Sequence, residues 1–132
     1  MSAFCFLDDI TELKKNESVT AFFTLKGSEE FLLDHFKGFP VMPGVLLLES
    51  LKQASLALLS GSKEWRDRGF RLVEVSDVKF GQFIKPGSTI KVIAKLLKIE
   101  DGQSFVDGRI ELQSQEGRSA KVLSAALTFA SA

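Results

Sequence analysis

The sequence predicts an α+β domain in which a curved antiparallel sheet of five to six strands wraps around one long central helix. Two observations support this prediction. The stretch from Val45 to Ser60 is apolar on nearly all faces and contains no Gly or Pro, which is typical of a helix buried in a core. After Gly61 the chain changes to runs rich in β-branched and aromatic residues. One long buried helix followed by several antiparallel strands favours a sheet that curls around the helix.

Two short elements and a loop are predicted before the helix. Residues 4–13 mix apolar and acidic side chains and fit either a strand or a short helix. Val19 to Lys26 is rich in β-branched and aromatic residues and predicts a strand. The loop from Asp34 to Pro43 follows, and Gly44 suits the start of the helix. Gly61 stands where a C-capping glycine is expected.

Four strands are predicted after the helix: Phe70 to Phe80, Thr89 to Glu100, Ser104 to Gln113 and Ala120 to Phe129. The breaks between them are dipeptides that end in glycine: Pro86-Gly87, Asp101-Gly102 and Glu116-Gly117. Asp-Gly between apolar runs is a strong hairpin signal. We therefore expect consecutive strands to be joined by tight turns into an antiparallel sheet.

The length and composition of the chain exclude several classes of protein. The 132 residues fit a single domain, residues 1–132, without repeats or linkers. Lys plus Arg and Asp plus Glu both total 17. The sequence therefore lacks the basic excess that is typical of nucleic-acid-binding proteins. The sequence contains one cysteine, Cys5, and one histidine. These are too few for an internal disulfide framework, and we do not expect a zinc site. No secretory signal or membrane span is recognisable, and the expected location is the cytoplasm.

Two side chains stand out as candidates for chemistry. His35 lies in a loop of Phe and Pro residues, and histidine titrates close enough to neutral pH to act as a base. The alternative is a loop histidine that is satisfied by a backbone carbonyl. Glu49 lies in the second turn of the apolar helix, where an unpaired carboxylate is costly. It is either a proton donor or acceptor, or part of a narrow polar stripe with Lys52 and Gln53.

Gly44 is a third candidate, through its backbone. Its N–H group would lie at the helix N-terminus with no side chain in front of it, where the helix dipole adds positive potential. Such a donor can hold a carbonyl oxygen that gains negative charge. The alternative is a glycine that only lets the chain turn. Nucleotide-binding loops and the motifs of zinc proteases and serine hydrolases are absent from the sequence.

The region around these residues resembles a known family. Residues 35–46, HFKGFPVMPGVL, followed by residues 49–53, ESLKQ, closely resemble the 3-hydroxyacyl-acyl-carrier-protein dehydratases of type II fatty-acid synthesis, which have the hotdog fold. The family pattern is H-F-x-G-x-P-V-M-P-G-V-L and then E-x-L-x-Q. Val78-Lys79-Phe80 with Pro86-Gly87 is similar to a second family segment. Lys37 and Lys52 stand where the family usually has a proline and a small residue.

The resemblance implies a dehydratase that converts 3-hydroxyacyl-carrier-protein thioesters to trans-2-enoyl thioesters without a metal or a cofactor. It implies that His35 takes the α-proton, that Glu49 protonates the leaving hydroxyl group, and that the Gly44 N–H binds the thioester oxygen. The Val41 carbonyl would orient His35. The resemblance also implies a homodimer or a trimer of dimers, in which His35 of one copy meets Glu49 of another.

Two larger sets of residues extend this hypothesis. Aromatic residues that would border the acyl tunnel are Phe36, Phe39, Phe80 and Phe83. Basic residues that would dock an acidic carrier protein, or that are ordinary surface charges, are Lys79, Lys85, Arg66, Arg68 and Arg71. Two alternatives to the dehydratase stay open: a hotdog acyl thioesterase in which Glu49 activates water, and a non-catalytic hotdog subunit that binds acyl chains.

Overall fold

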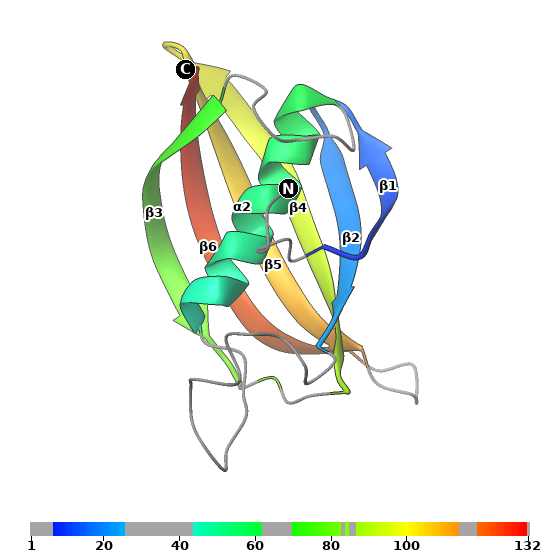
Figure 1. The fold of residues 1–132 in the computed structure, drawn as a ribbon. Helices are drawn as coiled ribbons and strands as arrows, with labels where there is room; N and C mark the ends of the chain where they lie inside the picture. The colour runs from blue at the N-terminus through cyan, green and yellow to red at the C-terminus, as the bar shows by residue number, and fades with distance from the viewer. Residues whose placement is uncertain are drawn as a thin grey trace.

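The computed structural model describes residues 7–25, 44–61, 70–82, 84, 87–113 and 119–131. Within these residues, a six-stranded antiparallel sheet curves around a helix, α2 (Figure 1). The elements follow in the order β1 (Asp9–Lys14), β2 (Ser18–Thr24), α2 (Gly44–Ser60), β3 (Phe70–Phe80), β4 (Thr89–Glu100), β5 (Gln103–Gln113) and β6 (Ser119–Ser131). The predicted α+β class, with a sheet wrapped around a long helix, is confirmed.

Most of the predicted elements occupy the expected positions. Strands β3 and β4 have the predicted bounds, and α2 begins one residue earlier, at Gly44. The first segment, which fitted either a strand or a short helix, forms strand β1. Asp101 and Gly102 both have positive φ values, 52° and 76°, and connect β4 to β5 as a two-residue hairpin turn. The Asp-Gly signal is therefore confirmed.

The expected tight turn between β3 and β4 is wrong. The strand order is β1-β2-β4-β5-β6-β3, so β3 and β4 are not neighbours. Instead, β3 pairs with β6 in antiparallel register, from Phe70 opposite Ser131 to Phe80 opposite Leu123. The backbone before β4 pairs with the end of β2, because Leu25 exchanges hydrogen bonds with Gly87 and Ser88. Gly87 thus belongs to a crossing connection, which local turn chemistry does not distinguish from a hairpin.

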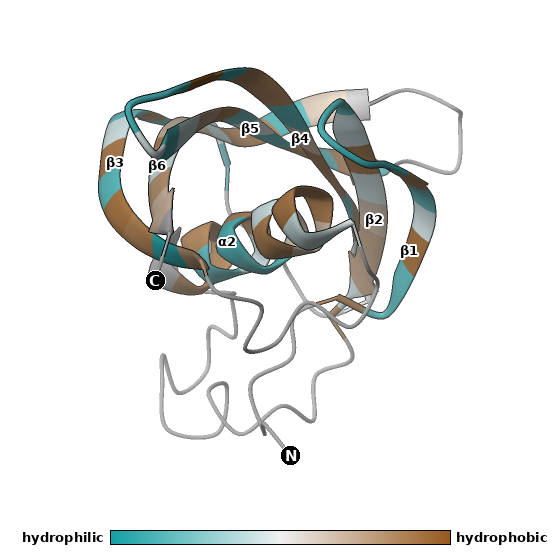
Figure 2. Cartoon of the chain, turned by 90° about the horizontal axis from the view of Figure 1, so that it is seen from above, coloured by the Kyte–Doolittle hydropathy of each residue, from teal (hydrophilic) through white to brown (hydrophobic). Residues whose placement is uncertain are grey.

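The core lies between α2 and the concave face of the sheet (Figure 2). Strand β2 alternates buried and half-buried residues, as expected for a strand with one face on a core. In β5 the buried face includes Gly108, which lies opposite the middle of α2. A Cβ atom added at Gly108 would lie 2.9 Å from Cδ2 of Leu51 and 3.1 Å from Cδ1 of Leu127. The missing side chain of Gly108 therefore allows the helix to approach the sheet closely.

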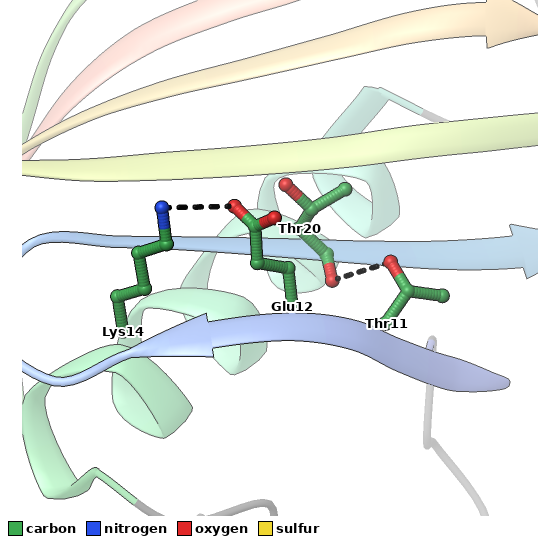
Figure 3. A network of polar contacts seen from close by, with 4 residues as sticks. All are labelled: Thr11, Glu12, Lys14 and Thr20. Carbon is green, nitrogen blue, oxygen red and sulfur yellow. Dashed lines mark hydrogen bonds and ion pairs between the residues drawn. The ribbon is translucent and has the colours of Figure 1, made fainter.

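The two edges of the sheet differ in chemistry. Edge strand β1 carries exposed polar side chains, including a Glu12–Lys14 ion pair of 4.0 Å and a 3.4 Å hydrogen bond from Thr11 Oγ1 to the Thr20 carbonyl oxygen (Figure 3). Edge strand β3 has two irregularities in its pairing with β6. It exposes three apolar side chains, Val73, Val78 and Phe80, by 39%, 46% and 44%. Among the described residues, no helix combines the length and the apolar character that are needed to cross a membrane.

Candidate active site

The N-terminal half of α2 is the part of the helix that is open to solvent. Leu46, Leu48, Glu49 and Lys52 are half-buried, whereas every residue of 53–59 is buried. The prediction that the helix is buried on nearly all faces is confirmed for residues 53–59, whereas residues 46–52 are only partly covered. Apolar composition alone did not reveal this opening, because exposure depends on which parts of the fold cover the helix.

The carboxylate of Glu49 has partners on its own helix. Lys52 Nζ lies 3.6 Å from Oε1, and Gln53 Nε2 donates a hydrogen bond of 3.1 Å to Oε2. The side chain of Glu49 remains 32% exposed and that of Lys52 38% exposed. The polar stripe predicted from the i+3 and i+4 spacing is confirmed. The stripe is compatible with a role in proton transfer, because a held carboxyl group that remains partly exposed suits that task.

Gln53 differs from the rest of this stripe because it is buried, with 1% of its surface exposed. The sequence placed Gln53 beside Glu49 but gave no sign that its amide would lie in the core. A buried amide requires hydrogen-bond partners, and the Glu49 carboxylate is one of the partners of Gln53. Ser55, also buried on α2, is satisfied in a simpler way: its hydroxyl group donates to the Leu51 carbonyl oxygen at 2.7 Å.

Gly44 is the first residue of α2. The first four N–H groups of a helix have no acceptor within the helix, so the Gly44 N–H is suited to bind a group from outside it. Glu49 follows five residues later, a rise of roughly 7.5 Å along the helix axis. The backbone donor and the residue that carries the carboxylate therefore lie on the same half of the helix, less than two turns apart.

The remaining predicted site residues fall into two groups. Three lie on β3: Phe80, Lys79 and Arg71. Arg71 pairs with Ala130 and Lys79 with Ser124, so the two basic residues are near opposite ends of the strand, roughly 26 Å apart along it. The others lie outside the described residues: His35, Val41, Phe36, Phe39, Phe83, Lys85, Arg66 and Arg68.

Solved structures with the same fold confirm the architecture. The dehydratase heterocomplex ApeI:P from Xenorhabdus doucetiae superposes with a TM-score of 0.70 at 15% identity, covering 92% of this chain and 96% of that one. The PaaI protein of E. coli superposes with a TM-score of 0.69 at 13% identity, covering 94% and 78%. At these identities the likeness concerns the fold, which is the hotdog fold.

Sequence comparison then identifies the family. The pattern of the ApeI-like family, described as ApeI dehydratase, matches residues 11–118. The 3-hydroxyacyl-[acyl-carrier-protein] dehydratase FabZ of Pediococcus pentosaceus is 36% identical over 102 residues, which cover 77% of this chain and 68% of the relative. FabZ of Lactobacillus helveticus is 31% identical over 117 residues, which cover 89% and 79%. The chain belongs to the ApeI-like dehydratase family.

Proposed function

We propose that this protein is a hydro-lyase that converts 3-hydroxyacyl-carrier-protein thioesters to trans-2-enoyl thioesters in fatty-acid or related lipid synthesis in the cytoplasm. Family membership supports the reaction class, and the FabZ relatives carry this activity in their names. The single observation that connects the reaction to this structure is the held, partly exposed carboxylate of Glu49 near the start of α2. A solvent-accessible carboxyl group at this position can deliver a proton to a leaving hydroxyl group.

The proposed mechanism divides the work among four groups. His35 removes the α-proton of the substrate, and the electron pair of that C–H bond forms the new double bond. Glu49 gives a proton to the β-hydroxyl group, the carbon–oxygen bond breaks, and water leaves. The Gly44 N–H binds the thioester oxygen as it gains negative charge, assisted by the dipole of α2. The Val41 carbonyl oxygen holds the imidazole of His35 in position.

We further propose that the active unit is a homodimer, alone or within a trimer of dimers, with His35 and Glu49 of each site on different copies. The edge strand β3 supports self-association, because Val73, Val78 and Phe80 expose apolar surface on the strand that ends the sheet within the described residues. The polar edge strand β1 has no comparable surface. Pairing through β3 would cover these apolar groups.

Two further groups of residues would contact the substrate: aromatic residues along the acyl chain and basic residues at the carrier protein. Phe80, exposed at the end of β3, contributes to the wall of the acyl tunnel together with Phe36, Phe39 and Phe83. The carrier protein is an acidic partner that docks on basic side chains. Because Arg71 and Lys79 are roughly 26 Å apart along β3, each would contact a different part of the carrier protein. Reversal of one charge at a time separates their contributions.

The direct test is to incubate the purified protein with a 3-hydroxyacyl-carrier-protein thioester and to follow the formation of the 2-enoyl product, with His35→Ala in parallel. We expect product from the unmodified protein and a loss of about 10²- to 10⁴-fold in His35→Ala. Release of free thiol without enoyl product would identify a thioesterase instead. Binding of the acyl chain with neither product would identify a non-catalytic subunit.

A further inference from the structure

The two oxygen atoms of the Glu49 carboxylate have different partners. Gln53 binds Oε2 through an amide that is itself 1% exposed, so this contact comes from a side chain fixed by the core. Lys52 faces Oε1 at 3.6 Å from a side chain that is 38% exposed. One partner is a rigid neutral donor, and the other is an adjustable cation.

A single contact is not sufficient to orient a carboxyl group. The terminal torsion of a glutamate side chain is broad, so a carboxylate bound at Oε2 alone can still turn and carry Oε1 away. The Lys52 ammonium group at Oε1 restricts that rotation, as the ion-pair partner of the carboxylate and as a donor to the unprotonated oxygen of the neutral acid. Orientation matters for proton delivery, because the donor oxygen has to lie within about 2.6–3.2 Å of the atom that receives the proton.

We propose that Lys52 is a positioning residue for Glu49: its ammonium group holds Oε1 as an acceptor, so that the proton of the neutral carboxyl group is carried by Oε2, beside the Gln53 amide, and is delivered to the substrate from one orientation. This inference rests on the proposed function, in which Glu49 protonates the leaving hydroxyl group. Lys52 itself transfers no proton and forms no bond to the substrate. It acts by restricting the carboxyl group of Glu49 to fewer orientations, so that the reactive orientation is populated more often.

A second lysine–glutamate pair in the molecule provides a comparison. Lys98 Nζ lies 3.4 Å from Glu100 Oε2 on β4, and both side chains are about 60% exposed, at 58% and 61%. Exposed pairs of this kind usually contribute little. The Glu49–Lys52 pair is less exposed, and its glutamate is also bound by a buried amide.

Lys98 also lies far from Glu49. Gly61, at the C-terminus of α2, packs against Lys15 in the turn before β2, and Glu17 of the same turn accepts a hydrogen bond from the Leu96 N–H. Lys98 is therefore near the C-terminal end of the helix, and Glu49 is roughly 18 Å away along the helix axis. Lys98→Met is a matched control for the loss of a lysine from a lysine–glutamate pair.

The experiment measures kcat and KM for 3-hydroxyacyl-carrier-protein dehydration by Lys52→Met over the full pH–rate profile. Met keeps most of the aliphatic stem and removes the ammonium group. We expect plateau kcat to fall about fivefold, equivalent to about 1 kcal/mol, with KM within about twofold of its original value. Lys52→Arg should restore kcat to within about twofold, and Lys98→Met should not change it. Lys52→Gln serves as a second variant if Lys52→Met unfolds.

Three results would overturn the positioning role. The plateau kcat of Lys52→Met could equal or exceed the original, or the pH–rate profile of this variant could shift along the pH axis without a change in plateau kcat. The third is a Lys52→Arg variant that is as impaired as Lys52→Met. Glu49→Gln is measured in the same assay to separate this inference from the proposed function. If the unmodified protein is inactive, or Glu49→Gln is fully active, the proposed function fails. If Glu49→Gln is inactive while Lys52→Met is normal, only the role of Lys52 fails.

Discussion

The two halves of α2 have different tasks. From Gln53 to Leu59 every side chain is buried, and the residues are mainly Leu, Ala and Ser packed on the concave face of the sheet. From Leu46 to Lys52 the helix alternates buried leucines with half-buried residues, among them Glu49. The C-terminal half therefore stabilises the fold, whereas the N-terminal half presents a carboxylate on a helix that is anchored in the core. A rigid support suits proton delivery, because misplacement by about 1 Å is costly.

The edges of the sheet show a similar division. Strand β1 ends the sheet with charged and hydroxyl side chains, which discourage pairing with another chain. Strand β3 ends it with apolar groups that a second copy could cover. Substitutions in the helix, in the core and on the two edge strands test both of these differences.

Leu58→Ala tests the structural half of the helix. Leu58 is fully buried, so its truncation leaves a cavity and should lower the free energy of unfolding by about 2–5 kcal/mol. Denaturant titration measures this change. Leu46→Ala, in the half-buried first turn, is the matched control and should cost clearly less. Equal losses for the two variants would contradict the division of the helix.

Gly108→Ala tests the close approach between α2 and β5. The new Cβ would lie 2.9 Å from Leu51 Cδ2, and we expect a loss of about 1–3 kcal/mol in the free energy of unfolding, measured by denaturant titration. In a Leu51→Ala background the same substitution should cost less, because the two nearest clashing atoms are gone and only the contact with Leu127 remains. An identical cost in both backgrounds would show that the helix and the sheet do not limit each other at this point.

Val78→Lys tests the apolar edge. A charge on β3 should raise the dimer dissociation constant at least about tenfold, or about 1.4 kcal/mol, because the lysine would have to lose its hydration. Sedimentation measures the constant. Dehydratase activity should fall in parallel at low protein concentration, since each proposed site needs two copies. Unchanged self-association would move the interface away from β3.

Lys14→Met, on the polar edge, should have the smallest effect. Lys14 and Glu12 are both more than half exposed, at 54% and 55%, and their 4.0 Å pair should contribute less than about 0.5 kcal/mol. Thermal unfolding and sedimentation of this variant should match those of the unmodified protein. A loss of self-association in Lys14→Met would mean that β1 also belongs to the interface.

The fold was predictable from sequence to the extent that its signals are local. The bounds of β3 and β4 and the hairpin at Asp101-Gly102 follow from residue patterns and turn chemistry. The place of β3 beside β6 was not predictable, because a pairing between strands so far apart along the chain leaves no mark on the turn that follows β3. The neighbours of a strand are decided by packing around the helix.

The candidate site was predictable where its contacts are local along the helix, and not where they depend on the packing of distant elements. Spacing along one helix placed Lys52 and Gln53 beside Glu49, and the structure confirms both contacts. Spacing did not reveal that Gln53 is buried while Glu49 is one-third exposed, because burial depends on where the sheet covers the helix. The roles of Glu49, Gly44 and Phe80 in catalysis remain predictions, as do those of His35 and Val41.

The most direct test of the account is a paired measurement on Glu49→Gln: its rate of 3-hydroxyacyl-carrier-protein dehydration and its thermal unfolding. The rate should fall by about 10²- to 10⁴-fold, because the amide cannot deliver the proton. The unfolding temperature should stay within a few degrees of the original, since the core half of the helix is untouched. A rate close to that of the unmodified protein, with the fold intact, would contradict the role of Glu49 and the division of the helix on which it depends.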